Sequence, residues 1–287
     1  NNAEVVISYD KQIEKGDRIV SIGNTELQKY ISKEIEQYPG ENKIWKQKKA
    51  FYKLVAGDFK SEEDILVERN GEKIVVPISR NLTNREVVIA RPYTLEWLDS
   101  NTLYIDGTRL NDFEMSELMG SFTKAKGLII DLRGDALFSE HFLGFFLDQS
   151  VPSFNWELDT YLTPCTKPLT RTINGYVKSK PSELTRNIVF LTNETSIGKS
   201  ETILQIVKNY KIGKIIGEPT AGSYDTMNEV KLPAMFNFSF DIYPMSFEND
   251  TEIKYKSIIP DITIKGKDNY PNDPKIIKAI EILKENY

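Results

Sequence analysis

The first 80 residues place their apolar side chains in two rhythms, one typical of strands and one typical of helices. Residues 4–9 and 17–22 carry the short apolar runs of strands, separated by a turn at residues 14–17. Residues 64–69 and 73–78 form a second pair of predicted strands. Because Asn70 and Gly71 both tolerate positive φ, the residues between that second pair predict a tight hairpin.

Two helical stripes lie between these strand pairs. The first consists of Leu27, Tyr30, Ile31, Ile35 and Tyr38, and the second of Ile44, Phe51, Leu54 and Val55. Their spacing of three and four residues predicts one apolar face on each of two helices. The sequence therefore predicts a small β-rich domain over residues 1–82, closing near Asn81.

From residue 83 onward, predicted strands and helices alternate. Strands are expected at residues 103–106, 127–132, 187–192 and 214–217, and a β-rich stretch continues to about residue 264. The helices between them carry these apolar residues: Met115, Leu118, Met119 and Phe122; an aromatic-rich segment over 139–147; Ile203, Ile206, Val207 and Tyr210; and, last, Ile276, Ile277, Ile280 and Leu283. Such alternation predicts a mainly parallel α/β core over residues 83–287.

Composition narrows the range of partners and cofactors. The chain has 287 residues, 40% of them hydrophobic, and a net charge of −5 without a basic block, which argues against nucleic acid as a partner. No apolar run reaches the roughly 20 residues of a transmembrane helix. Cys165 and His141 are the only residues of their kinds, so we expect no disulfide, no metal site and no cofactor. The chain begins with Asn1 and shows no signal segment, which we interpret as a mature or trimmed chain.

Three phrases in the second half occur in an order and spacing that belong together. They are residues 126–134 (KGLIIDLRG), residues 188–193 (IVFLTN) with a loop that ends at Ser200 and Glu201, and residues 215–222 (IIGEPTAG) followed by 259–262 (IPDI). In this arrangement the chain resembles the C-terminal-processing (tail-specific, tricorn-like) serine peptidases. Upstream, residues 15–22 (KGDRIVSI) and 67–71 (VERNG) resemble the PDZ domain that usually precedes that core.

The resemblance implies a fold and a chemistry. The implied fold is a spiral α/β core of the ClpP/crotonase type, preceded by a small β-rich PDZ-like domain. The implied chemistry uses a serine nucleophile where the second phrase turns from strand into helix. Free backbone N–H groups and the positive end of the helix stabilise an oxyanion there.

Mapped residue by residue, the family pattern leaves the nucleophile position without a nucleophile. In the family that serine lies three positions before the glutamate, here Glu201, and the position is Gly198. The lysine that some members use as a base would follow Gly222, where this chain has Ser223. Glycine closes the acyl-enzyme route.

The loop that helps to form the family's oxyanion site also differs. The family usually carries a Gly-Gly pair after its Asp-Leu-Arg phrase, whereas this chain continues from Gly134 with Asp135, an alanine, Leu137 and Phe138. We expect Leu137 and Phe138 to place bulk where the backbone approaches substrate. Gly134 and Asp135, with Thr220 and Gly222 of the third phrase, are the expected binding residues.

Other residues near Gly198 have a structural interpretation beside a chemical one. Ser196 and Ser200 could act as replacement nucleophiles, but such residues are favoured at helix starts in any case. Lys199 could act as a displaced base or be a solvated lysine. Glu201 could orient a base or simply favour the helix start.

Three other residues, all earlier in the sequence than Gly198, are expected to have a structural role. Asp131 and Arg133 sit at a strand end and are expected to hold a loop by pairing with each other. His141 is expected to be structural within its aromatic-rich helix.

The sequence therefore supports a peptidase-family homologue that has lost catalysis. It is expected to bind a peptide or an unfolded protein segment in the bacterial cell envelope, periplasmic or surface-exposed. One alternative is an active serine endopeptidase that processes protein C-termini with a relocated nucleophile. Another is a different reaction on the same architecture, since fold does not fix function. The sequence does not define an oligomeric state.

Overall fold

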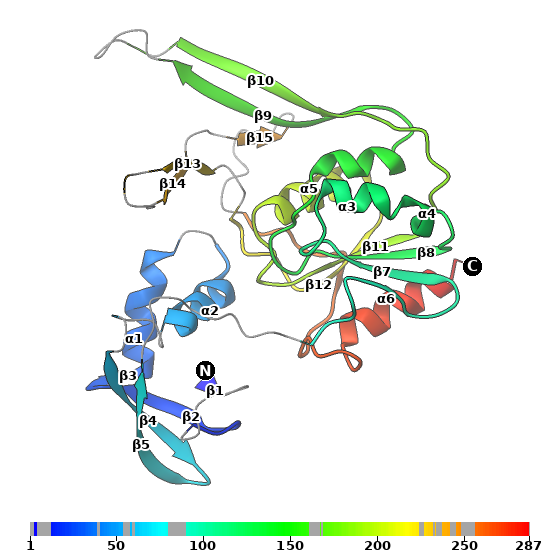
Figure 1. Cartoon of the computed structure of the whole chain (residues 1–287). Helices are drawn as coiled ribbons and strands as arrows, with labels where there is room; N and C mark the ends of the chain where they lie inside the picture. The colour runs from blue at the N-terminus through cyan, green and yellow to red at the C-terminus, as the bar shows by residue number, and fades with distance from the viewer. Residues whose placement is uncertain are drawn as a thin grey trace. The chain divides into compact units, whose positions relative to one another are not determined.

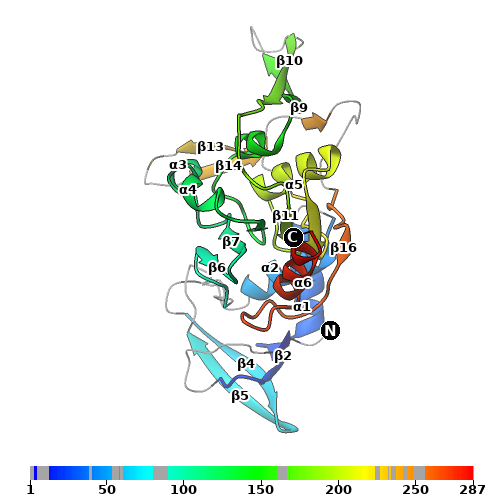
Figure 2. The same ribbon diagram turned by 90° about the vertical axis from the view of Figure 1, so that its right-hand side faces the viewer.

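The computed structural model divides into two compact units, residues 1–39 with 43–89 and residues 40–42 with 90–287 (Figure 1, Figure 2). The structure describes residues 3–4, 13–38, 41–53, 58, 61–79, 90–160, 167, 169–223, 227–231, 233, 237–241, 245–247 and 256–286. The predicted domain boundary at residue 82, Asn81, most of the strand expected over 4–9, and Cys165 lie outside these residues.

The first unit is a sheet with helices packed on it. The sheet runs in the order β1-β2-β4-β5, with β3 also paired to β2. Its elements are β1 (Ala3–Glu4), β2 (Arg18–Ile22), β3 (Thr25–Glu26), α1 (Leu27–Glu34), the 3₁₀ helix η1 (Ile35–Gln37), α2 (Lys43–Lys53), β4 (Glu62–Arg69) and β5 (Glu72–Ser79). Asn70 and Gly71 both have positive φ, 53° and 86°, so the hairpin between β4 and β5 forms where its turn residues predicted it.

The core of this unit follows the first predicted helical stripe but not all of the second. On α1, Leu27 and Ile31 are buried against the sheet residues Ile65 and Val67. On α2, Ile44 is 53% exposed, which contradicts its place in the predicted stripe, and Trp45 and Ala50 are buried instead. Phe51 packs against this core as predicted, whereas Leu54 and Val55 lie outside the described residues.

The second unit is built on a six-stranded sheet in the order β16-β12-β11-β8-β7-β6. Its strands are β6 (Leu95–Trp97), β7 (Thr102–Asp106), β8 (Gly127–Asp131), β11 (Ile188–Thr192), β12 (Lys214–Gly217) and β16 (Ile262–Thr263). All neighbours are parallel except the edge strand β6, which is antiparallel to β7. The α/β class predicted from the alternating pattern is confirmed.

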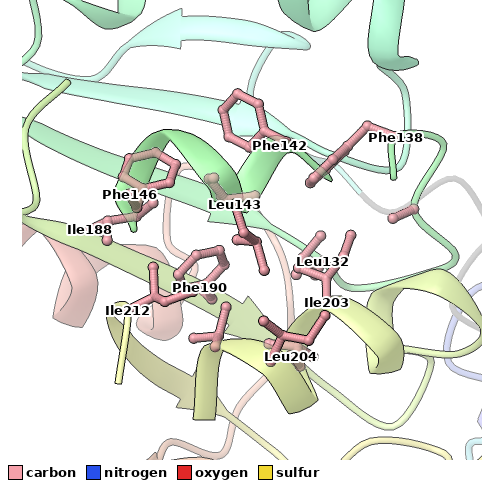
Figure 3. Packing of buried hydrophobic residues seen from close by; sticks show 14 of the residues in the cluster. Leu132, Phe138, Phe142, Leu143, Phe146, Ile188, Phe190, Ile203, Leu204 and Ile212 are labelled. Carbon is pink, nitrogen blue, oxygen red and sulfur yellow. The ribbon is translucent and has the colours of Figure 1, made fainter. Parts of the chain in front are cut away.

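Helices cover both faces of this sheet (Figure 1). Because successive residues of a strand point to opposite faces, the strands contribute side chains to two separate hydrophobic cores. The helices are α3 (Asp112–Glu117), α4 (Met119–Phe122), the 3₁₀ helix η2 (Glu140–Phe146), α5 (Lys199–Tyr210) and α6 (Pro274–Lys284). Leu128 and Ile130 of β8 pack in the cluster that includes α5 and η2, part of which Figure 3 shows. Ile129 between them packs in the cluster that includes Ile276 of α6.

Two helical predictions need correction. The aromatic-rich segment expected as an α-helix is the 3₁₀ helix η2, in which Gly144 lies so close to the backbone that an added Cβ would be 2.1 Å from the carbonyl oxygen of Lys178. The helix expected over 115–122 is divided at Leu118 into α3 and α4.

A long hairpin, which the sequence analysis did not predict, lies beyond η2. It consists of β9 (Val151–Thr160) and β10 (Leu169–Val177), and it extends away from α3 and α5 in both views (Figure 1, Figure 2). β15 (Met245–Phe247) pairs with β9, and β13 (Met227–Lys231) with β14 (Asn237–Asp241) forms a separate two-stranded sheet. Within the part of the chain that the structure describes, no helix has the length and hydropathy to cross a membrane.

Candidate functional site

Three loops meet at the carboxyl ends of the parallel strands, where α/β sheets usually place function. They follow β8, β11 and β12, and backbone hydrogen bonds join them. The amide of Ile197 donates to the carbonyl oxygen of Gly134 at 3.1 Å, and the amide of Ala221 donates to that of Ser196 at 3.1 Å. The expected binding residues of the first and third phrases are therefore brought beside the loop before α5.

Gly198 is the N-cap of α5 and adopts φ 58° and ψ −123°. Residues with a side chain rarely adopt this conformation, and the nucleophile of some hydrolases sits on a comparably strained strand-to-helix turn. The backbone amide of Gly198 donates to the carbonyl oxygen of Ser223 at 2.8 Å. The structure thus places Gly198 at the helix start, beside both Gly134's loop and Ser223, as the spacing to Glu201 predicted.

Asp135 is the side chain that lies against this position. Its Oδ1 accepts a hydrogen bond from the backbone amide of Lys199 at 3.0 Å. A Cβ added at Gly198 would be 2.6 Å from the same Oδ1. The carboxylate therefore caps α5 from a separate loop, a role that its position in the sequence did not indicate.

The obstruction expected from Phe138 is not found. Phe138 is fully buried in the hydrophobic core, where its ring packs edge-on against Phe142 at 5.5 Å between centroids (Figure 3). Leu137 is 50% exposed. The group that lies against Gly198 is the Asp135 carboxylate instead.

Glu201 lies fully buried in the first turn of α5, and its carboxylate accepts hydrogen bonds from the loop at the end of the third phrase. Its Oε1 accepts from the hydroxyl of Thr220 and from the amide of Gly222 at 2.7 Å, and its Oε2 accepts from the amide of Ser223 at 2.5 Å. Burial raises the pKa of Glu201 to about 7, against the lowering effect of these three donors, and the Asp135 charge raises it further. Among the residues that the structure describes, none forms an ion pair with Glu201.

Thr220 links this glutamate to the segment that follows the third phrase. Its hydroxyl donates to Glu201 and accepts from the backbone amide of Ile258 at 2.8 Å. Gly222 is buried and Ser223 is half-buried, and both use their backbone amides on Glu201. The predicted binding residues of this loop thus form its structural support.

The candidate replacement nucleophiles are buried. Ser196 is 0% exposed, and its Oγ accepts from the amide of Asn193 at 3.1 Å and from the hydroxyl of Thr192 at 3.0 Å. Ser200 is also 0% exposed. Lys199 is exposed, as expected of a solvated lysine at a helix start.

An ion network occupies the neighbouring strand ends. Arg133 donates to Asp131 from Nε at 2.9 Å and from Nη2 at 2.6 Å, while its Nη1 pairs with Asp273 at 2.5 Å and with Asp268 at 3.1 Å. Lys275 completes the network through Asp268 at 2.5 Å. The Asp131–Arg133 pair has the structural role that the sequence analysis preferred.

The buried aspartate in this network is strongly stabilised as an anion. Burial by itself would raise the pKa of Asp131, but Arg133 and Arg91 hold it well below its ordinary value. The hydroxyl of Tyr104 donates to the same carboxylate at 2.6 Å. Sequence reasoning missed Asp273, although an aspartate directly before Pro274 is a common helix-start signal.

The prediction for His141 can also be placed. His141 is exposed on η2 rather than packed among its aromatic residues. In the ranges that the structure describes, no group of three or more His, Cys, Asp or Glu side chains is arranged to hold a metal ion.

Comparisons with known proteins bear on the family and the fold. Residues 152–264 match the model of Peptidase family S41, which confirms the peptidase-family resemblance expected from the sequence. The comparison with curated proteins found no match.

Two solved structures of mature CPAF share this fold, and a third structure is similar over part of the chain. Mature CPAF superposes with a TM-score of 0.65 at 10% identity, covering 98% of this chain and 77% of that one. Mature CPAF complexed with lactacystin gives 0.64 at 12% identity, with 98% and 78% covered. A putative peptidase from Parabacteroides merdae ATCC 43184 gives 0.49 at 20% identity, and the chain covers 63% of its length.

Proposed function

We propose that this chain is an S41 peptidase homologue without peptidase activity, which binds peptides or unfolded protein segments. The observation that carries the proposal is the turn at Gly198. The position with the strained backbone of a nucleophile has no side chain, and the Asp135 carboxylate lies against it. Removing a nucleophile typically eliminates most of the rate enhancement of a serine hydrolase.

The buried serines weigh against a relocated nucleophile. A replacement serine needs an accessible hydroxyl within reach of a base. Ser196 and Ser200 are both 0% exposed, and the Ser196 hydroxyl is engaged by two donors within its own turn.

Peptide or unfolded protein is the proposed ligand because the S41 region and its fold belong to peptidases. The PDZ-like identity of the first unit is part of the same proposal. Its support is the sheet of β1, β2, β4 and β5 with α1 packed on its core. Location in the bacterial cell envelope, periplasmic or at the surface, is proposed from the family resemblance.

The activity half of the proposal is tested with a fluorophosphonate probe and with casein as substrate. The purified chain is expected to show neither a labelled serine by mass mapping nor cleavage above background. Cleavage that is lost in Ser196→Ala, Ser200→Ala or Ser223→Ala would overturn the proposal and identify the relocated nucleophile.

The binding half is tested by fluorescence anisotropy with labelled, reduced and carboxymethylated casein peptides. We expect saturable binding by the chain, measured with and without excess unlabelled peptide as the control. Anisotropy that stays flat at all protein concentrations would contradict the binding proposal while leaving the loss of catalysis intact.

A further inference from the structure

We infer that Asp135 closes the vacated nucleophile position from within, by keeping its own carboxylate at the N-terminus of α5 and so excluding external anions. The excluded groups include an oxyanion and the C-terminal carboxylate of a peptide. The inference deepens the proposed function and rests on the glycine at position 198.

Every backbone donor of the first turn of α5 already has a partner. Asp135 Oδ1 receives the amide of Lys199, and the carbonyl oxygen of Ile197 receives that of Ser200 at 3.1 Å. The carbonyl oxygen of Gly198 receives the next two amides, from Glu201 at 3.1 Å and Thr202 at 3.2 Å. Free amides at a helix start are what make it an anion site, so this helix start has none left to offer.

The amide of Lys199 is the donor that matters most. It directly follows the nucleophile position, where a hydrolase uses the next backbone amide to hold the oxyanion. In this chain a carboxylate already accepts that hydrogen bond, and it carries the charge that an oxyanion would bring. A second anion at the same place would meet electrostatic repulsion as well as an occupied donor.

The loop of Asp135 is held in register with the loop before α5. Asp135 and Ile197 form an isolated parallel bridge, and the amide of Ile197 donates to Gly134. Backbone pairing between the two loops thus holds the Asp135 carboxylate beside the start of α5. Asp135 itself is exposed, so solvent ions can reach its position once the carboxylate is removed.

Sulfate provides a test that needs one substitution. We compare the thermal midpoint of the chain, Asp135→Ala and the control Glu183→Gln in sodium sulfate and in sodium chloride of equal ionic strength. Asp135→Ala is expected to gain several degrees more from sulfate than the other two proteins, because the freed Lys199 amide and the helix dipole bind the ion. Equal sulfate responses in all three proteins would overturn the inference.

A thiol at the vacated position gives an independent measurement. In a Cys165→Ser background, Gly198→Cys is alkylated with iodoacetamide across pH, with and without Asp135→Ala. Removing the carboxylate is expected to lower the thiol pKa by about one unit, which is roughly tenfold more thiolate near neutral pH. An unchanged pKa would contradict the inference, and if Gly198→Cys does not fold, the sulfate measurement decides.

These outcomes are separable from those of the proposed function. Proteolysis by the unmodified chain would remove the proposed loss of catalysis without touching the sulfate result. An equal gain in thermal midpoint from sulfate in all three proteins would contradict the inferred role of Asp135, and it would leave the proposed loss of catalysis unaffected.

Discussion

Two buried carboxylates at the same edge of one sheet have pKa values that are shifted in opposite directions. Asp131 lies at the end of β8 among Arg133, Arg91 and Tyr104, and its pKa is held well below the ordinary value. Glu201 lies at the start of α5 among hydroxyl and amide donors, and its pKa is raised to about 7. Both side chains belong to residues that are 0% exposed, so burial alone does not separate them.

The difference lies in the cations. Guanidinium groups that face a buried carboxylate stabilise its charged form. Neutral hydrogen-bond donors offset the cost of burying that charge only in part. The ion network therefore stabilises Asp131 as an anion, whereas Glu201 has neutral donors and the nearby charge of Asp135, and no described residue forms an ion pair with it.

The largest expected effect comes from breaking the network at Arg133. Arg133→Met leaves Asp131, Asp268 and Asp273 buried without their shared partner. Breaking a buried pair in this way is expected to cost about 3–5 kcal/mol of the free energy of unfolding. Urea denaturation followed by circular dichroism measures the loss.

The matched control for this change is Arg186→Met. Arg186 also pairs with an aspartate, Asp148 at 2.5 Å, but the two side chains are 59% and 81% exposed. An exposed pair is screened by solvent and is expected to contribute far less to stability than the buried network. Equal losses for the two variants would show that the buried network does not support the fold.

The next largest effect is the pH dependence of Glu201. A group whose pKa is higher in the folded protein contributes stability at low pH and loses it as the pH rises through the folded value. Between about pH 4.5 and 8 we therefore expect the chain to lose on the order of 3 kcal/mol. Glu201→Gln, which does not titrate, is expected to flatten this slope, as measured by urea unfolding at several pH values.

A surface carboxylate provides the comparison. Glu183→Gln changes an exposed side chain and is expected to leave the slope as it is. The assignment to Glu201 fails if Glu201→Gln retains the full slope from pH 5 to 8.

The strands and the turn at Gly198 were predictable from sequence because local patterns determine them. Residues of β7, β8 and β11 are buried on both faces, and such strands appear as continuous apolar runs. The helix start at Lys199 followed from its distance to Glu201 and from the strand before it. These features depend on neighbours within a few residues.

The features that were missed depend on contacts far apart in the sequence or on weak patterns. Arg133 meets Asp273 140 residues later, and Asp135 meets Lys199 64 residues later, so no local spacing indicates either pair. Phe138 was assigned to the site although it belongs to the core, because an apolar residue in a loop does not reveal which way it points. β10 is exposed along most of its length, so it lacks the alternation that marks a half-buried strand.

A smaller effect is expected at the hydroxyl that connects Glu201 to residue 258. Thr220→Val keeps the shape of the side chain but removes one donor to Glu201 and the acceptor for the amide of Ile258. We expect a loss of about 1–2 kcal/mol and a shift of the stability–pH curve to higher pH, because this hydrogen bond lowers the pKa of Glu201. Thr123→Val, whose hydroxyl caps an exposed turn, is expected to change stability by less than about 0.5 kcal/mol.

The smallest effect separates the charge of Asp135 from its hydrogen bond. Asp135→Asn keeps an oxygen that can accept from the amide of Lys199, so the cap on α5 is retained. It removes the negative charge that raises the pKa of Glu201, so that pKa is expected to fall by less than about one unit. Because a lower folded pKa narrows the pH range over which stability is lost, the variant should show a shallower decline above pH 5, by under about 1 kcal/mol. Asp112→Asn is the control, since Asp112 also accepts from a backbone amide, that of Ser139 at 3.0 Å, in the same unit. If the two variants give identical curves, the Asp135 charge does not act on Glu201, and the raised pKa is due to burial alone.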